Sequence, residues 1–355
     1  MNRVRVLFLP LVDANNVNAQ SLNVREIALR LDPQRFHSTL WFEHEPDPRL
    51  LYHSAIRLEK LPRRGKTLRI LGQMISGCDL IGYMDFSPAS YLFLRLPKRL
   101  RHGAKAVLHA EGISQLLNPS RMFRFLYEGV YERCDIYTGI TQFVAEDLYR
   151  KFGKRTSYIL PVGVDTNLFK PPAARTNSIP VVLFAGAVVA RKGPQIVIDA
   201  AAQFPKAMFR IVGGARNGFG EELHRRIVEL GLQNVSLEGP RTQSQLLEIM
   251  QNSDIFLLPS RLEGMPKVSL EAAATGLPCV VFSNYQTPSV VNGVTGFQVG
   301  TQEEMMDAVG KLLEDRSLRD RMGKHAREHV MRFDWDIVSQ HWQNAYLAMA
   351  DSRVS

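Results

Sequence analysis

The stretch DIFLLPSRLEGMPKVSLEAAATGLPCVV, residues 254–281, has the pattern that decides the fold. DIFLLPS is an apolar run typical of a buried parallel strand, and Arg261 to Met265 form the loop that follows it. Pro266 suits the first position of a helix, because its φ is fixed and its missing N–H would have no helical partner there. Gly276 and Pro278 end this helix before the next apolar run. The loop therefore lies at the carboxyl end of its strand, the edge where open α/β sheets bind ligands.

Apolar runs alternate with helical patterns along the whole chain, which is typical of βαβ units and parallel sheets. The expected strands are VRVLFLPL, FHSTLWF, LIGYM, AVLH, DIYTGI and SYILP, then PVVLFAGA, MFRIVGG, VSLEG, DIFLLPS, PCVVF and GFQV. Between these groups, the prolines of NLFKPPAARTNSIP remove backbone donors and interrupt regular structure. We therefore predict an α/β chain of two Rossmann-like domains facing each other across a cleft. The expected bounds are residues 1–167 for the N-terminal domain, 168–180 for a linker, 181–330 for the C-terminal domain, and 331–355 for a final helix that could pack back on the N-terminal domain.

The composition, with 45% hydrophobic and 22% charged residues, is that of an ordinary globular chain. The three cysteines, Cys78, Cys134 and Cys279, lie far apart, which argues against a disulfide framework or a zinc site and favours a cytoplasmic location. We interpret the start, MNRVRVLFLPLVDANN, as a buried strand rather than a signal peptide, because no small-residue cleavage site follows it. No apolar stretch reaches the roughly 20 residues needed to cross a bilayer, so the chain is not expected to span a membrane.

The net charge is +9, and part of the excess lies in two basic clusters of the first half. These clusters are Arg57, Lys60, Arg63, Arg64, Lys66 and Arg69, and then Arg95, Lys98, Arg99, Arg101 and Lys105. Such clusters attract phosphates of nucleic acid or of an anionic membrane surface. Because they lack interleaved aromatic residues, nucleic acid is not an expected partner. In LRLPKRLRHGAK, Leu94, Leu96 and Leu100 stand among the cations, as in a segment that binds a membrane interface. A solvated surface without a partner remains the alternative.

The helix after Pro266 has the features of a nucleotide-sugar site. Its first amides, around Lys267 and Val268, carry the positive end of the helix dipole and favour an anion. Glu271 lies five residues past Pro266, about 7.5 Å along the helix axis, too far to serve that anion but within reach of hydroxyls attached to it. Glu263, in the loop, would meet polyhydroxylated substrate on the other side.

The stretch EGMPKVSLEAAATGLPCVV resembles the E-x7-E signature of retaining nucleotide-sugar glycosyltransferases of family 4, which have the GT-B fold. LFAGAVVARKG resembles the family's strand and loop that hold the donor diphosphate, and FRIVGG, NGVTGFQV and RFDW are similar to other parts of its donor domain. The first half is less alike, and contributes PVGVDTNLFKP and the strand-end histidine of AVLHAEG.

This resemblance implies a role for each matching residue. Lys192 would hold the donor diphosphate and stabilise the leaving group. Glu271 would bind the ribose, Glu263 the transferred sugar, and His109 would face the donor sugar from the acceptor side. The remaining donor-binding residues would be Gly186, Arg191, Gly264, Met265, Lys267 and Val268. Ala187 stands where the family usually has an arginine, and Arg191 is expected to substitute for it.

The expected reaction is metal-independent transfer from a nucleoside-diphosphate sugar, with no other cofactor, to a hydroxyl acceptor. A lipid-linked acceptor, glycolipid or cell-surface polysaccharide synthesis, and a peripheral location on the cytoplasmic membrane are the expected setting. The alternative is a non-catalytic basic protein of the same fold that binds a membrane surface or nucleic acid. GGARNGFG departs from the G-x-G-x-x-G dinucleotide spacing, and the DWD at Asp334 to Asp336 is better explained by a helix N-cap than by a metal site. A hydrolase would use two carboxylates but would have no need of a phosphate site.

Overall fold

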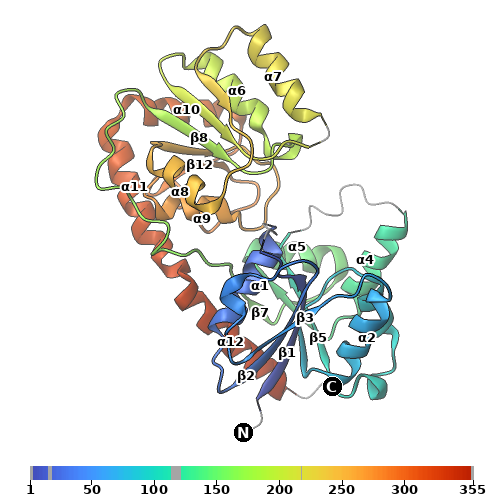
Figure 1. Ribbon diagram of the computed structural model, residues 1–355. Coiled ribbons are helices and arrows are strands. Elements are labelled where there is room, and N and C mark those ends of the chain that lie inside the picture. The colour runs from blue at the N-terminus through green and yellow to red at the C-terminus, as the bar shows by residue number, and fades with distance from the viewer. Residues whose placement is uncertain (1–2, 15–17, 113–120, 217, 353–355) are drawn as a thin grey trace. The chain divides into compact units, whose positions relative to one another are not determined.

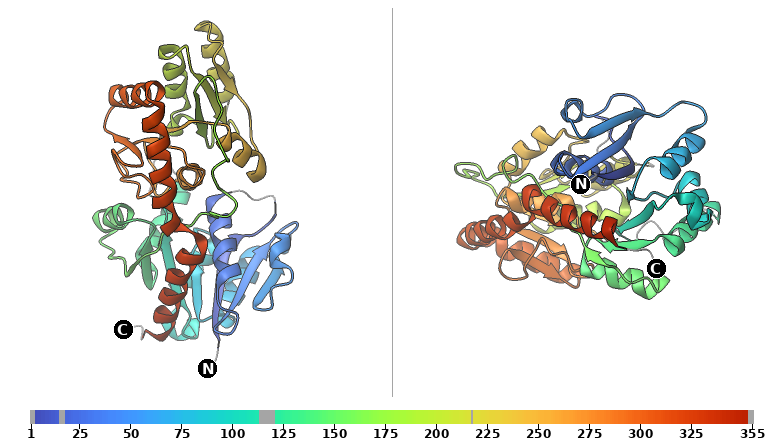
Figure 2. Two further views of the ribbon diagram at one scale, coloured as in Figure 1. Left: turned by 90° about the vertical axis from the view of Figure 1, so that its left-hand side faces the viewer. Right: turned by 90° about the horizontal axis from the view of Figure 1, so that it is seen from below.

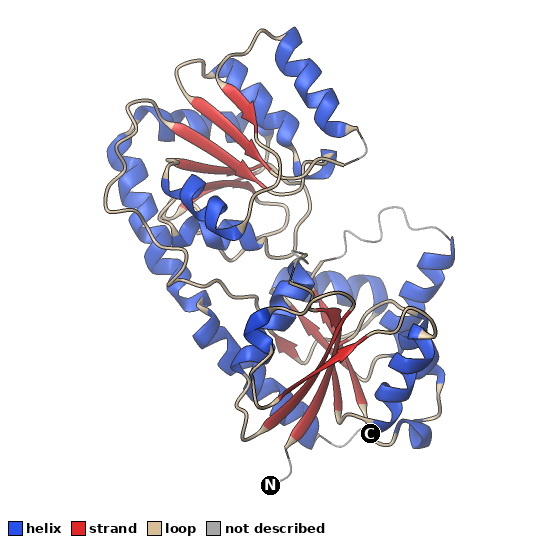
Figure 3. Cartoon of the chain, viewed as in Figure 1, coloured by secondary structure: helices blue, strands red, loops and turns tan. Residues whose placement is uncertain are grey.

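The computed structural model describes residues 3–14, 18–112, 121–216 and 218–352 of the chain. Its internal contacts divide it into two units, the first formed by Met1–Gly163 with Trp335–Ser355 and the second by Val164–Asp334. Each unit contains one parallel sheet with helices on both faces (Figures 1 and 3).

The first unit has a seven-stranded sheet in the order β3-β2-β1-β4-β5-β6-β7. The order runs outward in both directions from β1 and β4, which is the doubly wound arrangement that Rossmann-like domains share. Its elements are β1 (Val4–Leu11), α1 (Ala19–Arg30), β2 (Phe36–Phe42), η1 (Pro48–Leu50), β3 (Ile56–Lys60), α2 (Lys66–Ser76), β4 (Leu80–Tyr83), α3 (Pro88–Arg95), η2 (Lys98–Arg101), β5 (Lys105–Ala110), α4 (Arg121–Arg133), β6 (Ile136–Gly139), α5 (Gln142–Phe152), β7 (Tyr158–Ile159) and α12 (Trp335–Asp351).

The second unit has a six-stranded sheet in the order β10-β9-β8-β11-β12-β13. Its elements are β8 (Val181–Ala185), η4 (Ala190–Lys192), α6 (Pro194–Gln203), β9 (Met208–Val212), α7 (Phe219–Glu229), β10 (Val235–Leu237), α8 (Gln243–Gln251), β11 (Ile255–Leu258), α9 (Lys267–Ala274), β12 (Cys279–Phe282), β13 (Gly296–Val299), α10 (Gln302–Glu314), α11 (Arg316–Val330) and η5 (Met331–Phe333). Strands β8, β11 and β12 are buried almost throughout, which explains why they read as continuous apolar runs.

The final helix α12 packs in the first unit, beside α1 (Figure 2). Trp342 donates from Nε1 to the carbonyl of Pro161 at 3.0 Å, and Tyr346 donates from its hydroxyl to the carbonyl of Gly82 at 2.9 Å. The C-terminal carbonyls of the helix accept hydrogen bonds from Lys105 Nζ, with distances of 2.7 Å to Met349 and 2.8 Å to Ala350. Both indole and phenol are fully buried, so α12 is part of the core of this unit.

The segment predicted as a linker, residues 168–180, is held on the second unit. Arg175 donates hydrogen bonds to the carbonyls of Ser253, Thr275 and Gly276 at 2.7, 2.5 and 3.3 Å. Those carbonyls lie at the ends of α8 and α9, where helices leave acceptors unsatisfied. The segment contains no helix or strand, as its prolines predict.

No described helix has the length and apolarity needed to cross a membrane. The three cysteines are buried and unpaired.

Candidate functional site

The predicted donor site lies at one edge of the second sheet. Strands β8 and β11 are parallel neighbours, so the loops that follow them emerge at the same edge. The loop after β8 leads into η4, and the loop after β11 contains Glu263. The two loops are joined where the Arg261 N–H donates to the carbonyl of Arg191 at 3.2 Å.

Glycines allow the backbones at this edge of the sheet to approach closely, both in these loops and directly after β9. Gly193 has a φ of +75°, and a Cβ there would lie 2.2 Å from the carbonyl oxygen of Pro259. Gly213 has a φ of +149°, and its Cβ would lie 1.7 Å from the carbonyl oxygen of Gly186. Any larger residue would push the loops apart, so both positions require glycine. Gly186, a predicted donor residue, therefore lies at a backbone crossing one residue past β8.

The charged residues of this edge meet at Glu263. Lys192 forms an ion pair with Glu263 Oε1, Arg191 Nη1 lies 3.5 Å from the same oxygen, and Ser260 Oγ donates to it at 2.6 Å. Arg191 also donates to the carbonyl of Leu262 at 2.7 Å, which fixes its guanidinium on the loop. The structure thus brings together three of the predicted residues, and adds the buried Ser260, which the sequence did not single out.

Helix α9 begins beside this cluster. It starts at Lys267, one residue later than predicted, because Pro266 has an extended ψ of 114° and occupies the N-cap position. Pro266 has no side chain that could cap the first amides. Gly264 and Met265 are buried in the preceding loop, whereas Lys267 and Val268 are partly exposed at the helix start. The first amides of α9 therefore have no side-chain cap, and the anion site at this helix start stays a prediction.

Glu271 lies one helical turn beyond Lys267 and is only 8% exposed. Burial raises the pKa of the Glu271 carboxyl to about 7, and the charge of Lys267 acts in the opposite direction. A carboxyl with this pKa exchanges its proton near neutral pH, so its ability to accept hydrogen bonds from a ligand depends on pH.

His109 belongs to the first unit, whereas the other predicted site residues belong to the second. It lies within β5, is 5% exposed, and packs against the rings of Tyr83 and Trp342. Nδ1 is 2.7 Å from Thr138 Oγ1, and Nε2 is buried without a partner. Burial lowers the pKa of His109 to about 3, so the ring is neutral at physiological pH.

Asp334, the first residue of the DWD stretch, contacts Thr166 in the structure. Its carboxylate accepts hydrogen bonds from the backbone N–H of Thr166 at 3.2 Å and from the Thr166 hydroxyl at 2.5 Å. Among the described residues, no group of His, Cys, Asp and Glu has an arrangement that could hold a metal ion.

Two members of the basic clusters predicted at the surface are buried in the structure. Arg101 is 7% exposed, pairs with Asp135 at 3.2 Å and donates to the carbonyl of Leu94 at 2.8 Å. Lys105 is also 7% exposed because it caps α12. Their charges serve packing inside the first unit rather than a partner. The prediction that Leu94 lies at an interface is wrong, because this side chain is 3% exposed.

Other members of the clusters remain at the surface. Arg63, Arg64, Lys98 and Arg99 are exposed. Leu68 on α2 and Leu100 on η2 are 73% and 47% exposed, and these two elements are in contact. Exposed leucines, with Lys98 and Arg99, therefore lie on two neighbouring elements of the first unit, and Arg63 and Arg64 lie in the loop before α2.

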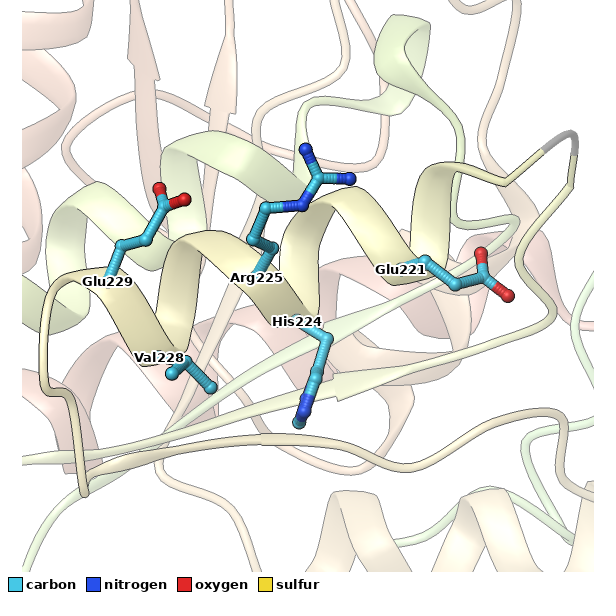
Figure 4. Close-up of a pocket in the computed structure, with 6 residues that line it drawn as sticks. Glu221, His224, Arg225, Val228 and Glu229 are labelled. Atoms are coloured by element: carbon cyan, nitrogen blue, oxygen red, sulfur yellow. The ribbon is translucent and has the colours of Figure 1, made fainter.

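A shallow groove of about 490 Å³ lies along α7 and contains none of the predicted residues. It is lined by Gly220, Glu221, His224, Arg225, Val228 and Glu229. Figure 4 shows His224 and Val228 on one side of this helix and Arg225 and Glu229 on the other. Side chains that diverge from one exposed helix do not converge on a ligand, so this groove is not a candidate site.

The class of fold is settled by comparison with solved structures. Sucrose-phosphate synthase from Thermosynechococcus elongatus has a TM-score of 0.80 with 20% identity, over 98% of this chain and 99% of that one. The HepE protein of Anabaena, solved with UDP and glucose, has a TM-score of 0.78 with 20% identity, over 98% of this chain and 100% of that one. The predicted α/β fold with two Rossmann-like domains of the GT-B kind is confirmed.

The second unit matches a known family model. Residues 166–329 match the model of the family described as "Glycosyl transferases group 1", which confirms the predicted resemblance over this part of the chain. A D-inositol 3-phosphate glycosyltransferase of Corynebacterium aurimucosum is 31% identical in an alignment 248 positions long, which covers 63% of this chain and 59% of that protein. A GDP-mannose-dependent monoacylated alpha-(1-6)-phosphatidylinositol monomannoside mannosyltransferase of Corynebacterium glutamicum is 28% identical in an alignment 290 positions long, which covers 73% of this chain and 74% of that protein. The chain thus spans about 59% of the length of the first of these relatives.

Proposed function

We propose that this chain is a retaining glycosyltransferase that moves a sugar from a nucleoside-diphosphate donor to a hydroxyl acceptor. The observation that supports it most is the meeting of Lys192, Arg191 and Glu263 beside the start of α9, at the shared edge of β8 and β11. Two cations and a helix N-terminus suit a diphosphate, and the two carboxylates suit hydroxyls.

In the free protein, Lys192 and Arg191, the cations proposed to bind the diphosphate, both contact Glu263. A donor diphosphate would compete with Glu263 for Lys192 and Arg191, since both anions bind the same groups. Glu263, released from Lys192, would then accept hydrogen bonds from the transferred sugar. Glu271 would accept hydrogen bonds from the ribose in its ionised form.

In the proposed reaction, the acceptor oxygen forms a bond to the anomeric carbon while the bond from that carbon to the leaving phosphate oxygen breaks. The acceptor proton passes to the departing diphosphate, so no side chain acts as a covalent nucleophile. Lys192 and the α9 amides stabilise the charge that grows on the leaving group, which is why no divalent ion is required. His109 is neutral, so its role is to position the donor sugar by a hydrogen bond rather than to donate a proton.

The acceptor is proposed to be lipid-linked and to lie at the cytoplasmic face of a membrane, in glycolipid or cell-surface polysaccharide synthesis. Two features support this setting: the exposed cations and leucines of the first unit, and the name of the mannosyltransferase relative, whose acceptor is a phosphatidylinositol glycoside. Basic residues near an anionic surface add about 1 kcal/mol each.

The test combines binding with turnover. A thermal-shift screen of nucleoside diphosphates and nucleotide sugars should find a stabilising ligand, since 100 times the dissociation constant adds about 2.7 kcal/mol. The same donors should then release nucleoside diphosphate. Stabilisation without release from any donor would favour the alternative of a non-catalytic binding protein, and the absence of both would refute the proposal.

A further inference from the structure

A second polar cluster lies in the first unit, where β4 and β5 end. We define the Glu111 cluster as Asn23, Tyr83, His109 and Glu111. Glu111 directly follows β5, and its Oε1 accepts hydrogen bonds from Asn23 Nδ2 at 2.8 Å and from the hydroxyl of Tyr83. Asn23 comes from α1 and Tyr83 is the last residue of β4, so three separate elements converge on this carboxyl.

Two buried atoms of this cluster have no partner among the described residues. They are Oδ1 of Asn23, whose side chain is 2% exposed, and Nε2 of His109, which is 5% exposed. Oδ1 belongs to the same amide whose Nδ2 is bonded to Glu111, so it necessarily lies beside that carboxyl. The ring of His109 packs on Tyr83, the other donor to Glu111. An unpaired buried polar atom costs about 1–3 kcal/mol, so each of these atoms indicates a missing hydrogen-bonding partner. Nε2 of His109 is the atom proposed above to position the donor sugar, which leaves Oδ1 of Asn23, beside Glu111, for a second ligand.

In the described part of the chain, the groups that contact the Glu111 carboxyl are neutral. Its hydrogen-bond donors are an amide, a phenol and the side chain of Gln20, and no described Lys or Arg forms an ion pair with Glu111. His109 is neutral as well. Glu263 in the second unit differs from Glu111 in this respect, because two cations, Lys192 and Arg191, contact its carboxylate. A phosphate monoester brings a charge of about −1.5 to −2 and mainly acceptor oxygens, and none of the described groups that contact Glu111 offers it a cation.

We infer that the Glu111 cluster binds the acceptor of the proposed transfer, and that this acceptor presents neutral hydroxyl groups there rather than a phosphate ester. Glu111 and Asn23 Oδ1 accept hydrogen bonds from these hydroxyls, since both offer acceptor atoms and neither tolerates an added anion. The inference rests on the proposed function and specifies its substrate: a neutral glycoside or polyol headgroup at the acceptor end.

The first experiment uses pairs of compounds that differ only in a phosphate. With the donor found by the thermal-shift screen, transfer is measured to inositol and D-inositol 3-phosphate, to methyl mannoside and its 6-phosphate, and to a set of other neutral hexosides with their phosphate esters. Neutral members should be used at least about tenfold better than their esters. Transfer to an ester in preference to its parent, or no transfer to any neutral member, would overturn the inference.

The second experiment separates acceptor binding from donor binding. Glu111→Gln keeps the shape of the side chain but removes its charge, so kcat/KM for the neutral acceptor should fall about tenfold or more. The donor dissociation constant and the slow hydrolysis of the donor by water should not change. Glu132→Gln, at an exposed position of α4, is the matched control and should behave like the wild type.

These readouts distinguish the two proposals. A protein that neither binds nor hydrolyses any nucleotide sugar contradicts the proposed function. A protein that binds and hydrolyses its donor, but transfers to acceptors equally well with Glu111→Gln, contradicts only the assignment of the acceptor site.

Discussion

Replacing Glu271 by glutamine should stabilise the free protein at alkaline pH and weaken its nucleotide binding. The carboxyl is 8% exposed, and burial raises its pKa from 4.5 to about 7. Below pH 4.5 the carboxyl is protonated in both the folded and the unfolded chain. Between pH 4.5 and 7 the unfolded chain releases this proton while the folded chain keeps it, so the free energy of unfolding falls as the pH rises.

The size of this effect follows from the shift in pKa. At about 1.4 kcal/mol per pKa unit, the shift corresponds to an upper bound of about 3 kcal/mol, all of it lost above pH 7. Glutamine cannot ionise, so Glu271→Gln should match the wild type near pH 4.5 and exceed its stability by up to about 3 kcal/mol at pH 8. At pH 8, where the variant is the more stable protein, it should bind nucleotide more weakly than the wild type. If the ionised carboxylate binds the ribose, wild-type affinity should rise between pH 6 and 8, and the variant should lack this rise.

The assay must measure the stability of the second unit, which contains Glu271. All three tryptophans, Trp41, Trp335 and Trp342, lie in the first unit, so their fluorescence is unsuitable. Urea unfolding followed by far-ultraviolet circular dichroism, with hydrogen exchange of the α9 and β12 amides, measures the required free energy at each pH. Glu229→Gln, at an exposed helical position of the same unit, is the matched control. Parallel pH profiles for the wild type and Glu271→Gln would refute the reasoning.

Three further predictions concern charge. Lys192→Ala should lower turnover about 100-fold or more without changing the far-ultraviolet spectrum. Lys206→Ala, at an exposed position of the same unit, is the control and should keep the wild-type turnover. A wild-type rate in Lys192→Ala would exclude the proposed diphosphate site. EDTA should leave turnover unchanged, and a loss restored by magnesium or manganese would contradict metal independence. The protein should float with vesicles that contain anionic lipid and dissociate as salt is raised. Replacing four exposed cations by serine should abolish flotation; these are Arg63, Arg64, Lys98 and Arg99. Equal recovery of the wild type with neutral and anionic vesicles would favour a soluble acceptor.

The strands that the sequence predicts well are those buried on both faces. β8, β11 and β12 are buried almost throughout, so their apolar runs are uninterrupted. Strand β3, with the sequence IRLEK, was not predicted because it lies at the edge of its sheet and alternates apolar with charged side chains. The sequence places Arg57 of this strand in a basic cluster, whereas in the structure it pairs with Glu59 of the same strand at 2.6 Å.

Charge counted along a sequence overestimates charge at the surface. Arg101 and Lys105 stand among cations in the sequence, yet each is buried where backbone carbonyls need donors. Those carbonyls come from α3 and from the end of α12, which lies far away in the chain. Only the packing of α12 against the first unit creates the need for Lys105. A flotation variant that included Arg101 would therefore test folding rather than membrane binding.

In the candidate site, too, the nearby sequence predicts some features, whereas others depend on residues that are far apart in the chain. The loop and helix that carry Glu263 and Glu271 were predictable, because proline and glycine at fixed positions determine where α9 begins and ends. The contact of Glu263 with Lys192 was not, because it depends on the parallel pairing of β8 with β11. This contact changes how a variant must be interpreted. Removing Lys192 also frees Glu263 from its partner, so loss of activity in Lys192→Ala reports on both residues. A double-mutant cycle with Glu263→Gln is needed to separate them, and non-additive effects are expected because the two side chains are in direct contact.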